Sequence, residues 1–108
     1  MTTAAAELET EVRRLRIRII SLTTAQLDEA APPAPSRRAA IRAALTEFSQ
    51  VGSEARPVPE LADHNLADQV VVLLEHGLCS AQTLPEPDRE NRIDALTEAA
   101  VRLRRALA

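Results

Sequence analysis

The sequence predicts an all-α fold, an antiparallel up-down-up-down four-helix bundle with long first and fourth helices. Apolar residues recur at alternating spacings of four and three in four separate segments, which places one apolar seam on each of four helices. Pro and Gly gather between these segments, at residues 32–35, 52–59 and 77–87. The length of 108 residues is that of one domain, so residues 1–108 are expected to form a single bundle.

The composition favours helix and requires an aliphatic core. The chain contains one Phe, no Tyr and no Trp, and only two glycines. Leu, Ile, Val and Ala must therefore fill the interior, and the abundance of Ala gives a high intrinsic helix propensity. The net charge of -3 argues against a general polyanion binder.

We expect helices over about residues 3–31, 36–51, 59–76 and 87–107. The seam of the first helix consists of Leu8, Val12, Leu15, Ile19 and Leu22. The seam of the fourth consists of Ile93, Leu96, Ala100, Leu103 and Leu107. The two middle helices have the shorter seams Ile41, Leu45, Phe48 and Leu66, Val70, Leu73.

Local signals mark the predicted helix ends. Ser36 is a candidate N-cap of the second helix, and Gly52 follows its last apolar position. Pro59 suits the first turn of the third helix, and Gly77 is expected to end it. Pro87 suits the start of the fourth.

Short connections predict that consecutive helices are antiparallel. Charge order supports the same arrangement for the first and fourth helices. The acidic residues of the first helix, Glu7, Glu9 and Glu11, precede its basic ones, Arg13, Arg14, Arg16 and Arg18. In the fourth helix Asp94 and Glu98 likewise precede Arg102, Arg104 and Arg105. Antiparallel packing would place acid opposite base, which specifies orientation although each exposed pair contributes only about 0–1 kcal/mol.

The stretch PELADHNLADQVVVLLEHGLCS contains the residues that could carry chemistry. His64 and Asp68 are one helical turn apart, and His76 lies close to Cys79. A structural zinc site needs four ligands in close local pairs, whereas the two histidines are separated by roughly 18 Å along one helix. We therefore expect neither a metal nor a cofactor, and Cys79 is interpreted as a spectator.

The sequence also argues against catalysis and against nucleic-acid binding. It has no Gly-x-Ser-x-Gly motif and no Gly-rich phosphate loop. The basic clusters are expected to face acidic residues, with Asp28 and Glu29 neutralising Arg37 and Arg38. No aromatic side chains are available as a stacking platform for bases.

Membrane association is not expected either, because the longest apolar run, residues 70–74, is far shorter than the roughly twenty residues of a span. The N-terminus lacks the basic and apolar regions of a signal peptide. A single cysteine cannot form an intramolecular disulfide. These features predict a cytoplasmic location.

Helix lengths lead to a prediction about assembly. The predicted first helix, roughly 42 Å long, would extend beyond middle helices of roughly 25 Å. The start of the first helix and the end of the fourth would then form a two-helix stem beyond the middle pair. This stem would expose Leu8, Val12, Leu103 and Leu107. Exposed apolar seams usually meet a partner, so we expect a homodimer joined through this stem.

Two further residues are candidates for a protein contact. Val71 and Val72 lie off the seam of the third helix, and at least one is expected to contact a partner. The predicted function is a non-enzymatic interaction module: an adaptor, a regulatory protein or a self-associating protein. The alternative is a regulatory bundle that responds to a small ligand or a metal.

Asp63 is predicted to point inward at the start of the third helix. Arg16 points inward on the first helix, so the two are expected to form an ion pair that sets helix register. The alternative is that Asp63 is an N-cap bound to the backbone of the third helix.

Overall fold

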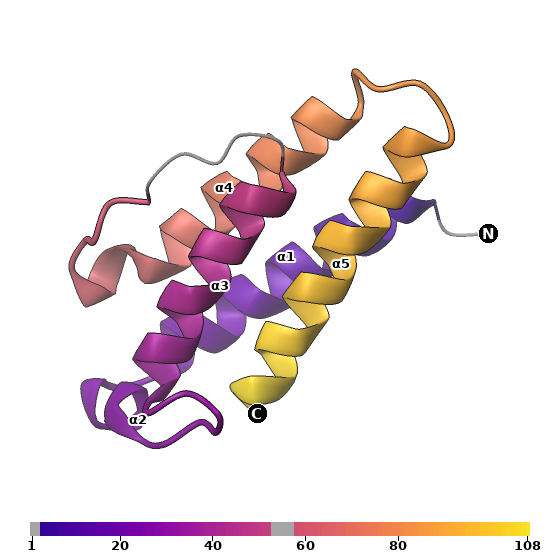
Figure 1. The fold of residues 1–108 in the computed structure, drawn as a ribbon. Coiled ribbons are helices and arrows are strands. Elements are labelled where there is room, and N and C mark those ends of the chain that lie inside the picture. Colours follow the sequence, from indigo (N-terminus) through magenta and orange to yellow (C-terminus); the bar gives the residue numbers. More distant parts are fainter. Residues whose placement is uncertain (1–2, 53–57) are drawn as a thin grey trace.

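The structure, a computed structural model, describes residues 3–52 and 58–108, and these residues confirm the all-α prediction (Figure 1). The helices are α1 (Ala4–Ser21), α2 (Thr24–Asp28), α3 (Arg37–Val51), the 3-10 helix η1 (Asp63–Asn65), α4 (Leu66–Ala81) and α5 (Asp88–Ala106). Within the described ranges the only β-type pairing is an isolated bridge between Ala31 and Ala34.

The four long helices enclose one hydrophobic core. α1 and α3 each pack against both α4 and α5, and α4 also contacts α5. The predicted seams are buried there except at Leu73, which is only partly buried, and the neighbouring Leu74 takes its place in the core. The largest fully buried side chains are Phe48, Leu8, Leu15, Ile41, Leu66, Leu74, Leu96, Leu107 and Val70. The radius of gyration of 13.5 Å is close to the roughly 13 Å of a compact chain of this length.

The direction of α4 differs from the prediction. Arg38 near the start of α3 binds Asp63 at the start of η1, and Gly52 at the end of α3 lies against Gly77 late in α4. The two helices therefore run in the same direction (Figure 1). An up-down-up-down order, with each helix antiparallel to the one before it, is thus wrong at this connection.

The length of the connection explains the difference. We expected the third helix to begin at Pro59, but η1 begins at Asp63, so eleven residues separate it from Val51. Eleven residues can span roughly 36 Å, whereas the 15 residues of α3 span roughly 22 Å. The chain is therefore long enough to return along the whole of α3 before the next helix starts.

The pairing of α1 with α5 is also different from the predicted antiparallel one. Glu11 contacts Arg104, and Arg18, about two turns later on α1, donates from Nε to the carbonyl of Leu107 at 2.8 Å. Both helices thus run in the same general direction (Figure 1). The expected contact between acid and base is present at Glu11, but it arises from a crossing of the helices.

The predicted first helix, 3–31, is broken after Ser21. Thr23 accepts a hydrogen bond from the backbone of Gln26, whose side chain accepts one from the Thr23 backbone, so a capping box starts α2. This Thr-x-x-Gln signal is visible in the sequence and was missed. α1 therefore has 18 residues, close to the 19 of α5, and the long first helix is absent.

The exposed stem predicted from that length is absent as well. Leu8 and Leu107 are fully buried, and Val12 and Leu103 are nearly so. All four belong to the core of the single chain. The expectation that they form an apolar seam open to a partner is wrong, because the seam of the shorter α1 packs against α4 and α5.

The remaining boundaries follow local signals to different extents. α3 and α5 match the predicted 36–51 and 87–107 within one residue, and the Ser36 side chain accepts from the Ala39 backbone as an N-cap. α4 instead continues past the predicted end at His76 to Ala81. Gly77 lies inside the helix, where its lack of a side chain permits close packing.

Candidate functional site: an apolar groove beside α4

One face of α4 lines a groove on the surface. The residues of this face have spacings of three and four, which places them on one side of a helix: Asp68, Gln69, Val72, Leu73 and His76. Asn65, at the end of η1, continues the same face. The end of α3 and the segment 58–61 form the other sides. Much of the polar stretch singled out in the sequence is therefore the lining of this groove.

The groove is mainly apolar and has the size of a binding site. Its cavity is about 470 Å³, within the roughly 300–1,000 Å³ of ligand pockets. Phe48 is fully buried beneath it, and Val58 packs against the core. Val72 and Leu61 also line it, and they remain 61% and 41% exposed. Two large apolar side chains are thus exposed to solvent at the same groove.

Polar contacts hold the outer wall of the groove in place. Gln69 donates from its side-chain amide to the carbonyl of Pro59 at 2.9 Å. Arg42 donates to the carbonyl of Leu61 at 3.1 Å. The wall is thereby tied to α4 on one side and to α3 on the other, so Leu61 is positioned by the fold.

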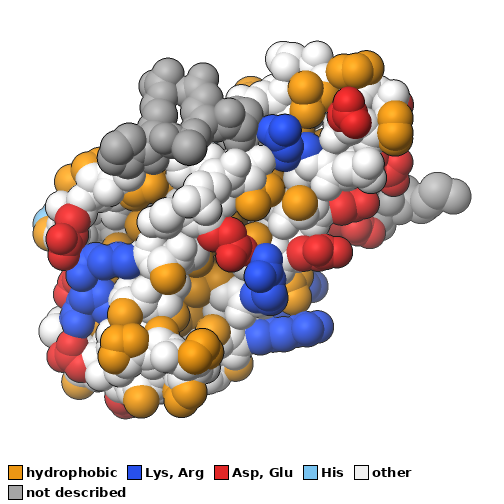
Figure 2. All heavy atoms as spheres, in the orientation of Figure 1, with side chains coloured by type: hydrophobic (Ala, Val, Ile, Leu, Met, Phe, Trp, Pro, Cys, Tyr) orange, Lys and Arg blue, Asp and Glu red, His pale blue; other side chains and the backbone are white. Residues whose placement is uncertain are grey.

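The groove lining carries a single acidic side chain among the described residues, and its outer wall carries an ion pair. Asp68 is the one Asp, Glu or Arg among the described residues that line it. Glu75 is exposed on the same helix, and exposed Glu60 lies 3.6 Å from Arg42 at the outer wall. Elsewhere the charges are mixed, as the face in Figure 2 shows, with Arg side chains beside Asp and Glu.

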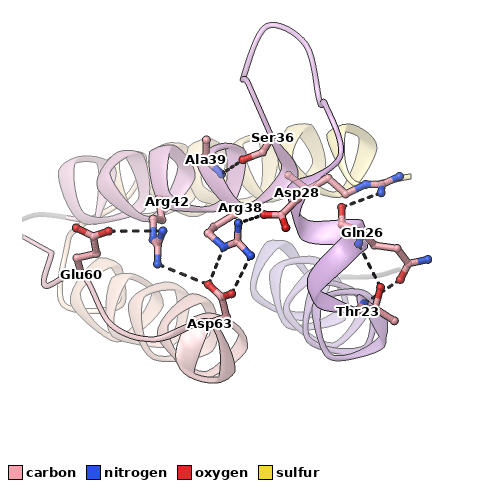
Figure 3. Close-up of polar contacts among 10 residues, drawn as sticks. Thr23, Gln26, Asp28, Ser36, Arg38, Ala39, Arg42, Glu60 and Asp63 are labelled. Carbon is pink, nitrogen blue, oxygen red and sulfur yellow. Dashed lines mark hydrogen bonds and ion pairs between the residues drawn. The ribbon is translucent and has the colours of Figure 1, made fainter.

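Asp63 is paired with an arginine, but the predicted partner is wrong. Arg38 donates to both carboxylate oxygens of Asp63, from Nε at 2.7 Å and from Nη2 at 2.8 Å (Figure 3). Arg16 is exposed on α1. The N-cap alternative is not found either, since no side chain caps η1 or α4. Because α3 and α4 are parallel, the start of α3 is the element level with Asp63.

The pair belongs to a wider ion cluster that joins α2, α3 and η1. Arg38 also binds Asp28 (Figure 3). Arg37 binds Glu29 at 2.7 Å, and the two contacts confirm the predicted neutralisation of these arginines. Hydrogen bonds from the Arg38 guanidinium lower the pKa of Asp63, and the carboxylates raise the pKa of Arg38. The charges of this cluster are therefore paired with one another within the fold.

Removing either partner of the Asp63–Arg38 pair should lower the melting temperature, by roughly 3–6 °C. We expect Asp63→Asn and Arg38→Gln together to cost clearly less than the sum of their separate effects, because each change alone already removes the charge-assisted contact between the two residues. Circular dichroism of the four proteins measures this coupling. Arg16→Gln is the control and should change little; coupling of Asp63 to Arg16 instead would contradict the observed pairing.

A second acid is buried between α1 and α5. Glu11, 7% exposed, accepts from Arg104 at 2.7 and 3.2 Å and from Arg14 at 3.1 Å. The hydrogen bond from Arg104 is the main reason that the pKa of Glu11 is lowered, against the opposing effect of burial. This contact fastens the two helices that sequence reasoning had placed in the opposite relative direction.

Acid should therefore destabilise the fold. The lowered pKa values of Glu11 and Asp63 mean that the folded state binds these protons less readily than the unfolded state. Their stabilisation is complete above the unfolded pKa, near pH 4, and is lost as pH falls toward the folded values. Melting curves between about pH 6 and 3 should show the loss. Glu11→Gln should flatten this dependence, whereas the exposed control Glu9→Gln should not.

The candidate metal ligands are separated in the structure. His64 lies with Asp63, Ile20 and Ala67 at a different hollow, and His76 lies in the groove. Within the described residues, no three His, Cys, Asp or Glu side chains are grouped so as to hold a metal ion. Cys79 is exposed, and its role as a spectator stays a prediction.

The two valines expected to form a contact differ in environment. Val71 is half-buried against the core, and Val72 is exposed in the groove.

Comparison with protein-family models, curated proteins and solved structures finds no significant match to this chain. In the part of the chain that the structure describes, no helix combines the length and apolar character needed to cross a bilayer.

Proposed function

We propose that this protein is a non-enzymatic interaction module that self-associates through the groove beside α4. The observation that carries this proposal is the pair of exposed apolar side chains, Val72 and Leu61, beside an apolar hollow whose outer wall is fixed. Grooves of this kind accept an amphipathic helix from a protein partner. Covering the two side chains would remove apolar surface from water, which favours association.

The chemistry of the groove favours binding over catalysis. Asp68 and His76 are its titratable side chains among the described residues, and they are two helical turns apart. That separation is roughly 12 Å along the axis, too far for both to act on one reacting bond. The single exposed cysteine is consistent with the reducing cytoplasm as the place of action.

A second candidate is a small apolar ligand, because a cavity of about 470 Å³ is large enough to hold one. In that case Val72 and Leu61 would close over the ligand and no second protein would be needed. Native mass spectrometry of the purified protein separates the two proposals, since it reports both subunit number and any retained small molecule.

Val72→Asp should abolish self-association without unfolding the chain. Sedimentation velocity up to about 100 µM should show the wild type gaining mass with concentration and the variant remaining monomeric. Thr46→Asp is the matched control, because it adds the same charge at an exposed position of α3 outside the groove. A wild type that stays monomeric throughout, or a Val72→Asp variant that associates as the wild type does, would overturn the proposal.

A further inference from the structure

A second exposed apolar surface lies on α1. Ile17 and Ile20 are 68% and 59% exposed, and among the large hydrophobic residues that the structure describes only Val72 is comparably exposed. Arg13 and Arg16 are exposed on the same side, because the four positions have helical spacings of three, four and seven. We call these four residues the α1 face.

Within residues 3–52 and 58–108, the arginines of the α1 face form no ion pair and no hydrogen bond to another helix. Arg14 and Arg18 of the same helix bind Glu11 and the carbonyl of Leu107. Arg13 instead donates to the hydroxyl of Thr10 at 3.3 Å. Among the described residues, no carboxylate lies within ion-pair distance of Arg13 or Arg16. Two cations therefore flank two apolar side chains with their charges available to another molecule.

The α1 face and the groove are complementary in charge and in spacing. On α1, Arg16 precedes Ile20 by one helical turn. On α4, Asp68 precedes Val72 by one turn. If α1 of one molecule lies parallel to α4 of another, the arginine meets the aspartate while the isoleucine meets the valine. Opposite charges at the rim orient the contact, and apolar burial at its centre stabilises it.

We propose that the α1 face of one copy binds the α4 groove of a second copy, head to tail. This inference rests on the proposed self-association and names the occupant of the groove. A molecule cannot fill its own groove in this way, since the opposite side of α1 already packs against α4 and α5. Each copy keeps one unused groove or face, so the assembly grows with concentration or closes into a ring.

Like charges disfavour the symmetric alternatives. A groove paired with a groove would bring Asp68 toward the Asp68 of the other copy. An α1 face paired with another would bring Arg13 and Arg16 together. Each juxtaposition of like charges costs free energy, whereas the head-to-tail contact pairs each sign with its opposite.

Mixing two disabled variants tests the inference. Val72→Asp removes the groove and keeps the α1 face; Ile17→Asp with Ile20→Asp removes the face and keeps the groove. Each alone should be monomeric at about 100 µM, and an equimolar mixture should form a complex of one copy of each and nothing larger. Native mass spectrometry identifies it because the two variants differ in mass. Circular dichroism confirms that both are folded.

The outcomes separate the inference from the proposal on which it rests. If Val72→Asp abolishes association but the double variant still self-associates, the α1 face is not the occupant and the groove contact stands. A mixture that forms no complex overturns the inference too. If the wild type is monomeric, both fall. A second measurement exchanges the charges. Arg16→Glu and Asp68→Arg should each weaken self-association, and the mixture of the two, which restores an opposite-charge pair, should have an association constant at least tenfold higher than either variant alone.

Discussion

Gly77→Val should destabilise the protein by about 2–3 kcal/mol, as expected for an overpacked core. A Cβ atom at Gly77 would lie 3.0 and 3.3 Å from the two methyl carbons of Leu96 and 3.4 Å from the Cα of Gly52. Valine adds two more carbons whose rotamer is restricted in a helix. Leu96 is fully buried and has little room to move away. Urea unfolding followed by circular dichroism measures the loss.

Two controls separate crowding from helix propensity. Gly77→Ala adds only the Cβ and gains up to about 1 kcal/mol of helix propensity, so its net effect should be small. Glu75→Val places the same β-branched residue at an exposed position of α4. If Gly77→Val were no worse than Glu75→Val, the close approach of α3, α4 and α5 at this glycine would not limit packing.

Phe48→Ala should have the larger effect, about 3–5 kcal/mol. Phe48 is the one aromatic residue of the chain, and its side chain is fully buried at the end of α3, beneath the groove. Truncation removes its apolar contacts and leaves a cavity that the surrounding helices fill only in part. The total free energy of unfolding of a domain of this size is about 5–15 kcal/mol, so the midpoint of urea unfolding should fall sharply.

Phe48→Leu is the matched control for this prediction. Leucine keeps an apolar side chain of comparable size, and such exchanges usually cost less than about 1.5 kcal/mol. A similar loss for alanine and leucine would mean that ring shape, not buried volume, matters at this position. A loss below about 1 kcal/mol for alanine would contradict the burial of Phe48 in a closely packed core.

Helix formation and the identity of the core residues were predictable from the sequence. The seams of α1 and α5 are buried as their spacing predicts, and Ser36 caps α3. These features depend on neighbours within one or two turns, so they are visible locally. The break after Ser21 is of the same kind, since the Thr23–Gln26 capping box can be found by inspection. Missing it produced the long first helix and the exposed stem.

The tertiary structure decided the direction of α4, and the partner of Asp63 follows from it. Helical periodicity correctly indicated that Asp63 pairs with an arginine, but Arg38 rather than Arg16 lies level with it. Helical spacing places Asp68, Val72 and His76 on one face, whereas the exposure of that face depends on the wall at residues 58–61. A connection of eleven residues permits either direction, and the choice depends on packing between segments far apart in the chain, which local periodicity does not encode.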